Sequence, residues 1–160
     1  MLKELGRFKN MIGPALYKSE NIREVLLGKD YKDRYKSEAE IIKDLKSNIF
    51  SHLFIDEVID ETQTYIFYDV TMPRFSRSMK TCQVTIYAFC HKSLIDTISK
   101  QGYEGNRVDI LCQMVESEVL APENIREYGV GKLELTSVKL YSDQRKFYGK
   151  VMEFSVPDFR

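Results

Sequence analysis

The sequence has no tryptophan, only two histidines, and three cysteines without a Cys-X-X-Cys spacing. Cys82 and Cys90 fall on one predicted strand, where eight residues span roughly 26 Å, so they cannot form a disulfide with each other. His91 follows Cys90 directly, and adjacent strand residues point to opposite faces, which makes this pair a poor metal site. We therefore expect reduced, buried thiols, as in a cytosolic protein, and structural or surface histidines.

Net charge is also lacking, because 24 Lys and Arg residues balance 24 Asp and Glu residues. Dedicated nucleic-acid-binding proteins usually have a basic excess, so the balance argues against that class while leaving a local basic patch open. No apolar run approaches the ~20 residues that span a bilayer, and the first six residues lack the apolar segment of a signal peptide. We expect no association with membranes.

Recognisable chemistry is scarce as well. The segment Gly129-Val-Gly-Lys132 lacks the first glycine and the final Ser or Thr of a phosphate loop and precedes a predicted strand, which indicates a turn. The acidic run Asp56–Glu61 could bind a divalent ion, but a solvated loop is the simpler interpretation. No Ser-His-Asp spacing or nucleophile elbow occurs. We expect no catalytic residue, no cofactor, no metal and no enzymatic activity.

The most regular stretch is Thr81–His91, which alternates between small apolar residues and Thr, Gln, Tyr, Phe or His. A period of two with β-branched and aromatic residues predicts a strand with one face on a core. A second alternating stretch, Thr62–Thr71, should pair with it in antiparallel fashion. Pro73 is expected to end that strand because proline cannot donate to a sheet.

Helix signals lie on both sides of this hairpin. Ser19 can cap a short helix over Glu20–Leu27, and a capping box at Ser37–Glu40 begins a helix expected to reach about Phe50. The clearest later helix is Arg107–Leu120, with strands to follow at Lys132–Leu140 and Phe147–Val156. Residues 1–18 contain the break signal Gly13-Pro14, and Pro157 should stop the last strand.

The element order predicts an α+β fold: an antiparallel or mostly antiparallel sheet of about four strands with two main helices on one face. Residues 1–36 are interpreted as an N-terminal arm and linker with a short helix. Residues 37–160 are interpreted as a single α+β domain, for which the chain length is sufficient.

Two features suggest contacts with partners. The connection between the paired strands carries Arg74, Phe75, Arg77 and Lys80 without an acidic residue. It is either a solvated connector or a projecting loop that contacts a protein partner or lies near a phosphate backbone. The short N-terminal helix is marginal alone, so its apolar residues Ile22 and Leu26 must pack against the domain or a neighbouring subunit.

Aromatic residues are the other candidates, since the chain has ten tyrosines and nine phenylalanines. Tyr65, Phe67, Tyr87 and Phe89 should share the outer face of the paired strands. Either helices of the same chain cover this face, or it is a subunit interface, where tyrosine and phenylalanine are enriched.

Several segments resemble small structural proteins of tailed bacteriophages of Gram-positive hosts, and the similar segments are Asn21–Gly28, Val84–His91, Gly129–Leu135, Phe147–Lys150 and Val156–Phe159. The predicted element order is similar to that of the tail-terminator, or tail-completion, group of phage neck proteins. In that group a small α+β subunit forms a ring, commonly a hexamer, at the head-proximal end of the tail.

The resemblance implies a structural virion protein of the tail or neck that is present in the host cytoplasm during assembly. Its partners would be copies of itself, the tail tube protein and the head-connector proteins, with DNA passing the lumen without being read. The resemblance supplies no functional residues. Two alternatives stay open: a head-tail stopper or connector adaptor, and a small nucleic-acid-binding α+β module that uses Arg74, Phe75, Arg77 and Lys80.

Overall fold

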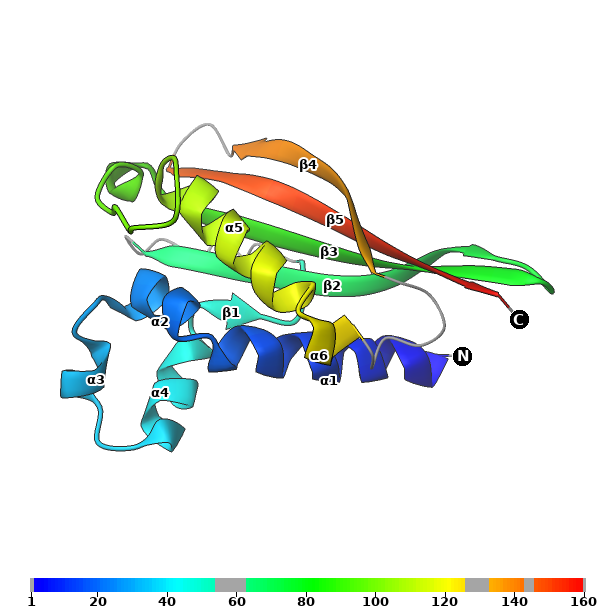
Figure 1. Ribbon diagram of the computed structural model, residues 1–160, viewed down its shortest axis with the longest axis horizontal. Helices are drawn as coiled ribbons and strands as arrows, with labels where there is room; N and C mark the ends of the chain where they lie inside the picture. Colours follow the sequence, from blue (N-terminus) through cyan, green and yellow to red (C-terminus); the bar gives the residue numbers. More distant parts are fainter. Residues whose placement is uncertain (1, 54–62, 126–132, 143–145, 160) are drawn as a thin grey trace.

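The computed structural model describes residues 2–53, 63–125, 133–142 and 146–159 (Figure 1). The expected turn at 129–132 and the acidic run at 56–61 lie outside these ranges. The elements in chain order are α1 (Leu2–Lys18), α2 (Glu20–Leu27), α3 (Tyr31–Arg34), α4 (Glu38–Leu45), β1 (Ile49–Phe50), β2 (Thr64–Phe75), β3 (Met79–His91), the 3-10 turn η1 (Lys92–Leu94), α5 (Arg107–Val119), α6 (Pro122–Ile125), β4 (Glu134–Ser142) and β5 (Phe147–Phe159).

The strands form one mixed sheet in the order β1-β2-β3-β5-β4. The expected antiparallel pairing of the two central strands is confirmed, with Ile66 opposite Ala88. The α+β class is also confirmed, but the expected four strands become five. The additional strand is β1, which pairs in parallel with β2 through Ile49 and Ile66.

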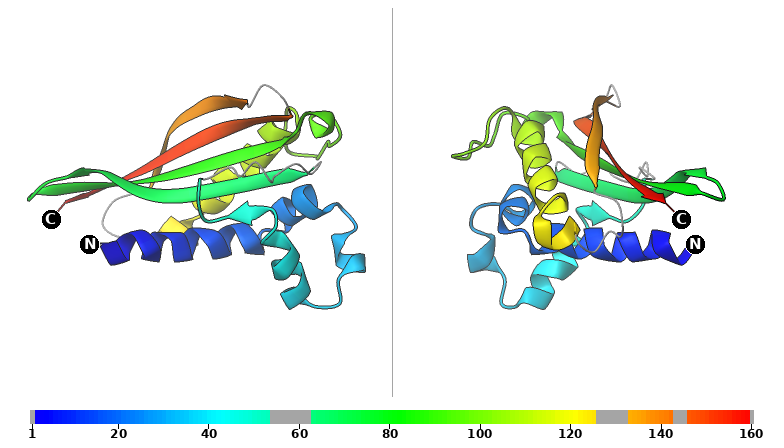
Figure 2. Two further views of the ribbon diagram at one scale, coloured as in Figure 1. Left: turned by 180° about the vertical axis from the view of Figure 1, so that it is seen from behind. Right: turned by 45° about the vertical axis from the view of Figure 1, so that its right-hand side comes forward.

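The helices α1, α2 and α5 pack on one face of this sheet (Figure 2). Alternate residues of β2, β3 and β5 face them, as the period of two predicted. The central members of this core are almost completely buried: Ile12, Leu16, Ile22, Ile66, Val84, Ile86, Leu111, Val115, Met152 and Phe154. All three cysteines are free and buried.

Leu2–Lys18 form a helix that continues through the expected break at Gly13-Pro14. An internal proline costs about 3 kcal/mol, whereas each large apolar side chain buried contributes roughly 1.5–3 kcal/mol. Phe8, Ile12 and Leu16 are buried together against the sheet, so their burial outweighs the cost of Pro14. Phe8, Ile12 and Leu16 of the segment expected to be an arm thus belong to the common core.

Helix α4 ends at Leu45, shorter than the helix to about Phe50 that the sequence predicted. Asn48 explains the difference, because its carbonyl oxygen accepts a hydrogen bond from the Ile66 amide at 2.8 Å and its side-chain amide donates to the Thr64 carbonyl at 2.9 Å. These contacts with β2 place Ile49 in the core as a strand residue. Pairing with a distant strand overrides the local helical spacing.

Neither proline that was expected to stop a strand does so. In β2, the register shifts between Thr71 and Arg74, so Pro73 lies in a β-bulge opposite β3. In β5, Pro157 pairs with Thr81, while β4 begins its pairing at Ser155. Among the described residues, Pro157 therefore has a sheet neighbour on one side only. Bulges and strand edges are the positions where a sheet tolerates proline.

Helix α5 is fixed at its first turn by Asp109. The Asn106 side chain accepts a hydrogen bond from the Asp109 amide, and the Asp109 carboxylate accepts one from the Asn106 amide at 3.0 Å, which completes a capping box. The same carboxylate forms an ion pair with Lys150 of β5. Burial raises the pKa of Asp109, but the hydrogen bonds from Lys150 and the Asn106 amide outweigh it and hold the pKa below its usual value.

Gly149 of β5 lies opposite Phe89 of β3, and a Cβ at position 149 would come within 2.7 Å of the Phe89 Cα. We expect Gly149→Ala to lower the free energy of unfolding by roughly 1–3 kcal/mol through overpacking. Gly6→Ala is the matched control, since a Cβ there meets nothing within 4 Å and helix α1 should gain up to about 1 kcal/mol. Denaturant unfolding measures the free energy of unfolding of both variants. Equal changes in the two variants would contradict the close approach of β5 to Phe89.

Asp109→Asn should destabilise the protein by about 1 kcal/mol at neutral pH, because the ion pair with Lys150 is lost. A carboxyl group with a depressed pKa stabilises the fold above its unfolded value of about 3.9 and loses this effect as the pH falls through the folded value. The difference from the wild type should therefore disappear in strong acid. The control is Asp96→Asn, which makes the same change at an exposed site. If the free energy of unfolding of Asp109→Asn differs from that of the wild type by the same amount at every pH, the linkage is refuted.

Candidate assembly surfaces

The β2–β3 hairpin is the most protruding part of the sheet. Its far end extends beyond the helices that cover the rest of the sheet, close to the end of β5 (Figure 1). The strands continue into the segment 72–80 that was expected to be a loop, and the turn is reduced to Ser76, Arg77 and Ser78, which are all exposed. Arg74 and Phe75 lie on β2 opposite Thr81 and Lys80, but their side chains are outside the described part.

Lys80 does not project from the tip with Arg77. Its side chain is 8% exposed, and its Nζ lies 2.6 Å from Glu4 Oε2 on α1. A partly buried ion pair of this kind holds two elements in register, because leaving either charge alone in a poorly solvated position costs free energy. The structure thus assigns Lys80 to the junction between α1 and the hairpin. This corrects its expected place in a projecting basic loop.

The aromatic residues of the outer face are mostly covered within the chain. Tyr65, Phe67 and Phe89 are at most 3% exposed and form a second core cluster with Phe147. The ring centroids of Phe67 and Phe89 lie 5.2 Å apart in an edge-to-face arrangement. These three residues are therefore buried within the chain and not exposed to a partner, although they pack against Phe50, Leu53 and Tyr141 and not under helices, as one interpretation expected. Tyr87 is only partly buried.

The short helix α2 packs against the main domain. Ile22 is fully buried in the large core, which corrects its role as a candidate contact with a neighbour. Arg23 on the same helix donates to the Tyr17 carbonyl at 2.6 Å and forms an ion pair with Glu38. Glu38 holds the pKa of Arg23 above its usual value. Leu26 is only partly buried, and it lines a pocket beside α4.

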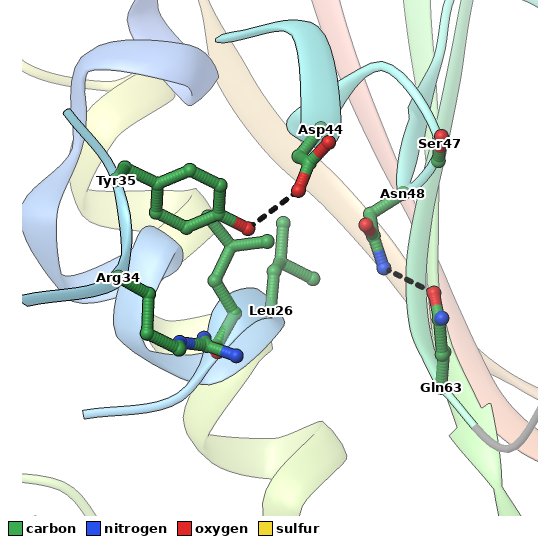
Figure 3. Close-up of a pocket in the computed structure, with 8 residues that line it drawn as sticks. Leu26, Arg34, Tyr35, Asp44, Ser47, Asn48 and Gln63 are labelled. Carbon is green, nitrogen blue, oxygen red and sulfur yellow. Dashed lines mark hydrogen bonds between the residues drawn. The ribbon is translucent and has the colours of Figure 1, made fainter. Parts of the chain in front are cut away.

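That pocket has a volume of about 430 Å³ and lies between α2, α3, α4 and the start of β2 (Figure 3). Two pairs of its polar side chains are hydrogen-bonded: Tyr35 donates to Asp44 at 2.6 Å, and Asn48 donates to Gln63 at 3.0 Å. Such mutual pairing stabilises the local fold. Side chains that are paired in this way do not offer these polar groups to a ligand.

A neighbouring pocket of about 470 Å³ contains Arg107, the first residue of α5. Its guanidinium donates to the carbonyls of Leu94 and Val25 and to the Thr97 hydroxyl, at 2.8–3.1 Å. Burial lowers the pKa of Arg107. Arg107 is the first residue of α5, so these hydrogen bonds hold the start of α5 against α2 and η1.

The thiols are poorly placed for nucleophilic chemistry. Burial raises the pKa of Cys112 to about 12 and that of Cys90 to about 11, so the reactive thiolate is scarce at neutral pH. Within the described ranges, no group of three or more His, Cys, Asp or Glu residues could hold a metal ion. None of the helices described combines the length and apolar composition that a membrane crossing needs.

One surface that sequence reasoning missed is β4, an edge strand of the sheet. Val138 and Leu140 on this strand are 49% and 69% exposed, and Leu2 on α1 is 77% exposed. These are the exposed large apolar residues of the described part. The sequence predicted a strand at Lys132–Leu140, but it could not show that the described helices leave Val138 and Leu140 exposed.

Comparison with known proteins places the chain in a family. No curated protein matches the sequence. Residues 15–156 match the sequence model of the YomW family. The match begins near the end of α1 and ends within β5, so it covers every element from α2 to β4 in full and part of α1 and β5. The chain therefore belongs to the YomW family.

Proposed function

We propose that this protein is a structural component of a tailed-phage virion, the tail terminator ring that caps the tail tube and joins it to the head connector. The observation that carries the proposal is the β2–β3 hairpin, which extends past the helical layer (Figure 1). It ends in an exposed Arg77 with no acidic residue between Met72 and Lys80. A projecting element of this kind can reach a different protein above or below the ring, along the axis of the tail.

Other observations support this proposal. The family name resembles that of a phage-derived Bacillus gene, which points toward a phage protein. The segments quoted from the sequence resemble phage structural proteins, and the observed α+β subunit agrees with the architecture that this resemblance implies. Two pairs of polar side chains in the pocket beside α4 are bonded to each other, while the exposed large apolar residues of the described part lie on β4 and at the start of α1.

The mechanism would be geometric. Copies joined by a head-to-tail contact close into a ring if the rotation between them permits. The hairpins of all copies then project at equivalent positions, where one ring can meet the end of the tail tube and another virion component. With Lys80 paired to Glu4, the described cation at the tip is Arg77. A single cation for each subunit is compatible with a hairpin that lies near a phosphate backbone, but it is too small a charge for tight DNA binding.

The position in the particle can be tested with phage lacking the gene. A terminator stops tube polymerisation, so its loss should give tails longer than normal that do not join heads. A stopper or connector adaptor acts on the head side, so its loss should give tails of normal length and unjoined heads. Electron microscopy measures tail length, and mass spectrometry of purified virions detects the protein. Its absence from virions would refute a structural role.

The tip can be tested separately from the fold by comparing Arg77 with Lys80. Arg77→Glu at the exposed turn should change the free energy of unfolding by less than about 0.5 kcal/mol and reduce the yield of joined particles. Lys80→Gln should lower the free energy of unfolding by roughly 1–2 kcal/mol, because it leaves Glu4 without its partner. Thermal unfolding and particle counts measure the two effects. If Arg77→Glu gives a normal yield of joined particles, the tip serves only to link β2 to β3.

A further inference from the structure

Within the part of the chain that the structure describes, the basic side chains that are buried or partly buried pair with carboxylates, with one exception. The pairs are Lys9–Asp69, Arg23–Glu38, Lys80–Glu4, Lys100–Glu24 and Lys150–Asp109. The exception is Arg107, which is partly buried and forms no ion pair with any described residue. A charge that is poorly solvated and has no counter-charge costs free energy, so its position attracts an anion.

The hydrogen bonds of Arg107 orient its guanidinium without neutralising it. All of their acceptors are uncharged, and they are the carbonyl oxygens of Leu94 and Val25 and the hydroxyl oxygens of Thr64 and Thr97. Nη2 carries two N–H groups and donates to Thr97 alone, so one N–H is left without an acceptor among the described residues. Arg107 therefore offers both a charge and a donor to a ligand.

The pocket of about 470 Å³ that Arg107 lines has an excess of positive charge. Lys29 also lines it, is exposed, and has no ion-pair partner in the ranges that the structure describes. Glu24 is the one acid among the described lining residues, and its carboxylate lies 2.5 Å from Lys100 Nζ. The Cys90 thiol near Arg107 has a pKa of about 11, so it is uncharged at neutral pH. An anion in this pocket would meet two cations that have no other counter-charge.

The remaining wall and the bonding of Arg107 favour one kind of anion. Leu26, Leu94 and Ile98 give the pocket an apolar side. Phosphate sites commonly use the guanidinium fork in a bidentate contact, but most of this fork is bonded to the protein itself. A carboxylate on a short aliphatic stem needs only one N–H for one oxygen, and its stem can lie against the apolar side.

We propose that the pocket at the start of α5 binds a small carboxylate with a short aliphatic stem. One carboxylate oxygen accepts the remaining N–H of Arg107 Nη2, and Lys29 pairs with the carboxylate from the rim. A free acid and the glutamate side chain of another protein carry the same group, and the test separates these two sources. The site does not depend on the position of the protein in a virion.

The test is a titration of the whole chain with sodium butyrate, with sodium chloride added to hold the ionic strength constant. The side-chain Nε–H signal of Arg107 and the amide signals of Lys29 and Thr97 should shift and reach saturation, with a dissociation constant on the order of a millimolar. Nuclear magnetic resonance measures the shifts. Sodium phosphate should bind more weakly, because it cannot use the apolar side or the guanidinium fork.

Three variants identify the residues that bind. Lys29→Ala removes an exposed side chain and should weaken butyrate binding roughly two- to fivefold. Lys43→Ala, which removes an exposed lysine of α4, is the matched control and should leave the affinity unchanged. Arg107→Gln should abolish binding. Because Arg107 also holds the start of α5, circular dichroism must show that this variant is folded, and Lys29→Ala decides the matter if it is not.

The source of the carboxylate is tested with glutamate that is acetylated at its amino group and methylamidated at its carboxyl group, so that only the side chain is charged. Binding as tight as that of butyrate assigns the site to an acidic side chain of a partner protein. Binding of butyrate alone assigns it to free acids. Both results support the carboxylate site.

Three results would overturn the site: no saturable shift with butyrate, equal affinities in Lys29→Ala and the wild type, or tighter binding of phosphate than of butyrate. None of them bears on the proposed tail terminator, which the length of tails in phage lacking the gene tests separately.

Discussion

The structure depends on burial of the apolar face shared by β2, β3 and β5. Most of the completely buried large aliphatic side chains lie either on this face or on the helices above it. Burying such side chains contributes roughly 1.5–3 kcal/mol each, which exceeds what helix caps and exposed ion pairs supply. The polar contacts have local roles: Asp109 caps the start of α5, Arg107 joins α5 to α2 and η1, and Lys80 joins α1 to the hairpin. The sheet face supplies most of the free energy that keeps the helices in place.

The sheet is unusual in being buried on both faces at one end. Phe67 and Phe89 pack on the outer side, while Ile66 and Ala88 pack on the helical side. Gly149 makes this arrangement possible, because β5 has no side chain where it passes Phe89. A face that looks like an interface by its aromatic content can thus be interior to the subunit, and the exposed apolar residues lie at the edge strand instead.

Local signals predicted a large part of the fold. The Ser19 and Ser37 caps, the strand Thr81–His91 and the helix from Arg107 are confirmed, because each depends on residues close in sequence. The errors at Pro14, Pro73 and the end of α4 arose where contacts with distant residues override the local preference. The candidate surfaces were harder to predict. Burial of Phe89 and Lys80 depends on what packs across them, and the exposure of Leu140 depends on where α5 stops covering the sheet.

The ion pair between Glu4 and Lys80 joins the first turn of α1 to the projecting hairpin close to its turn. Lys80 is opposite Phe75, the last paired residue of β2 before the turn, so α1 is bonded directly to the far end of the hairpin beyond the bulge at Pro73. The irregular, bulged part of the hairpin thus lies between two fixed points, the sheet on one side and the helix on the other.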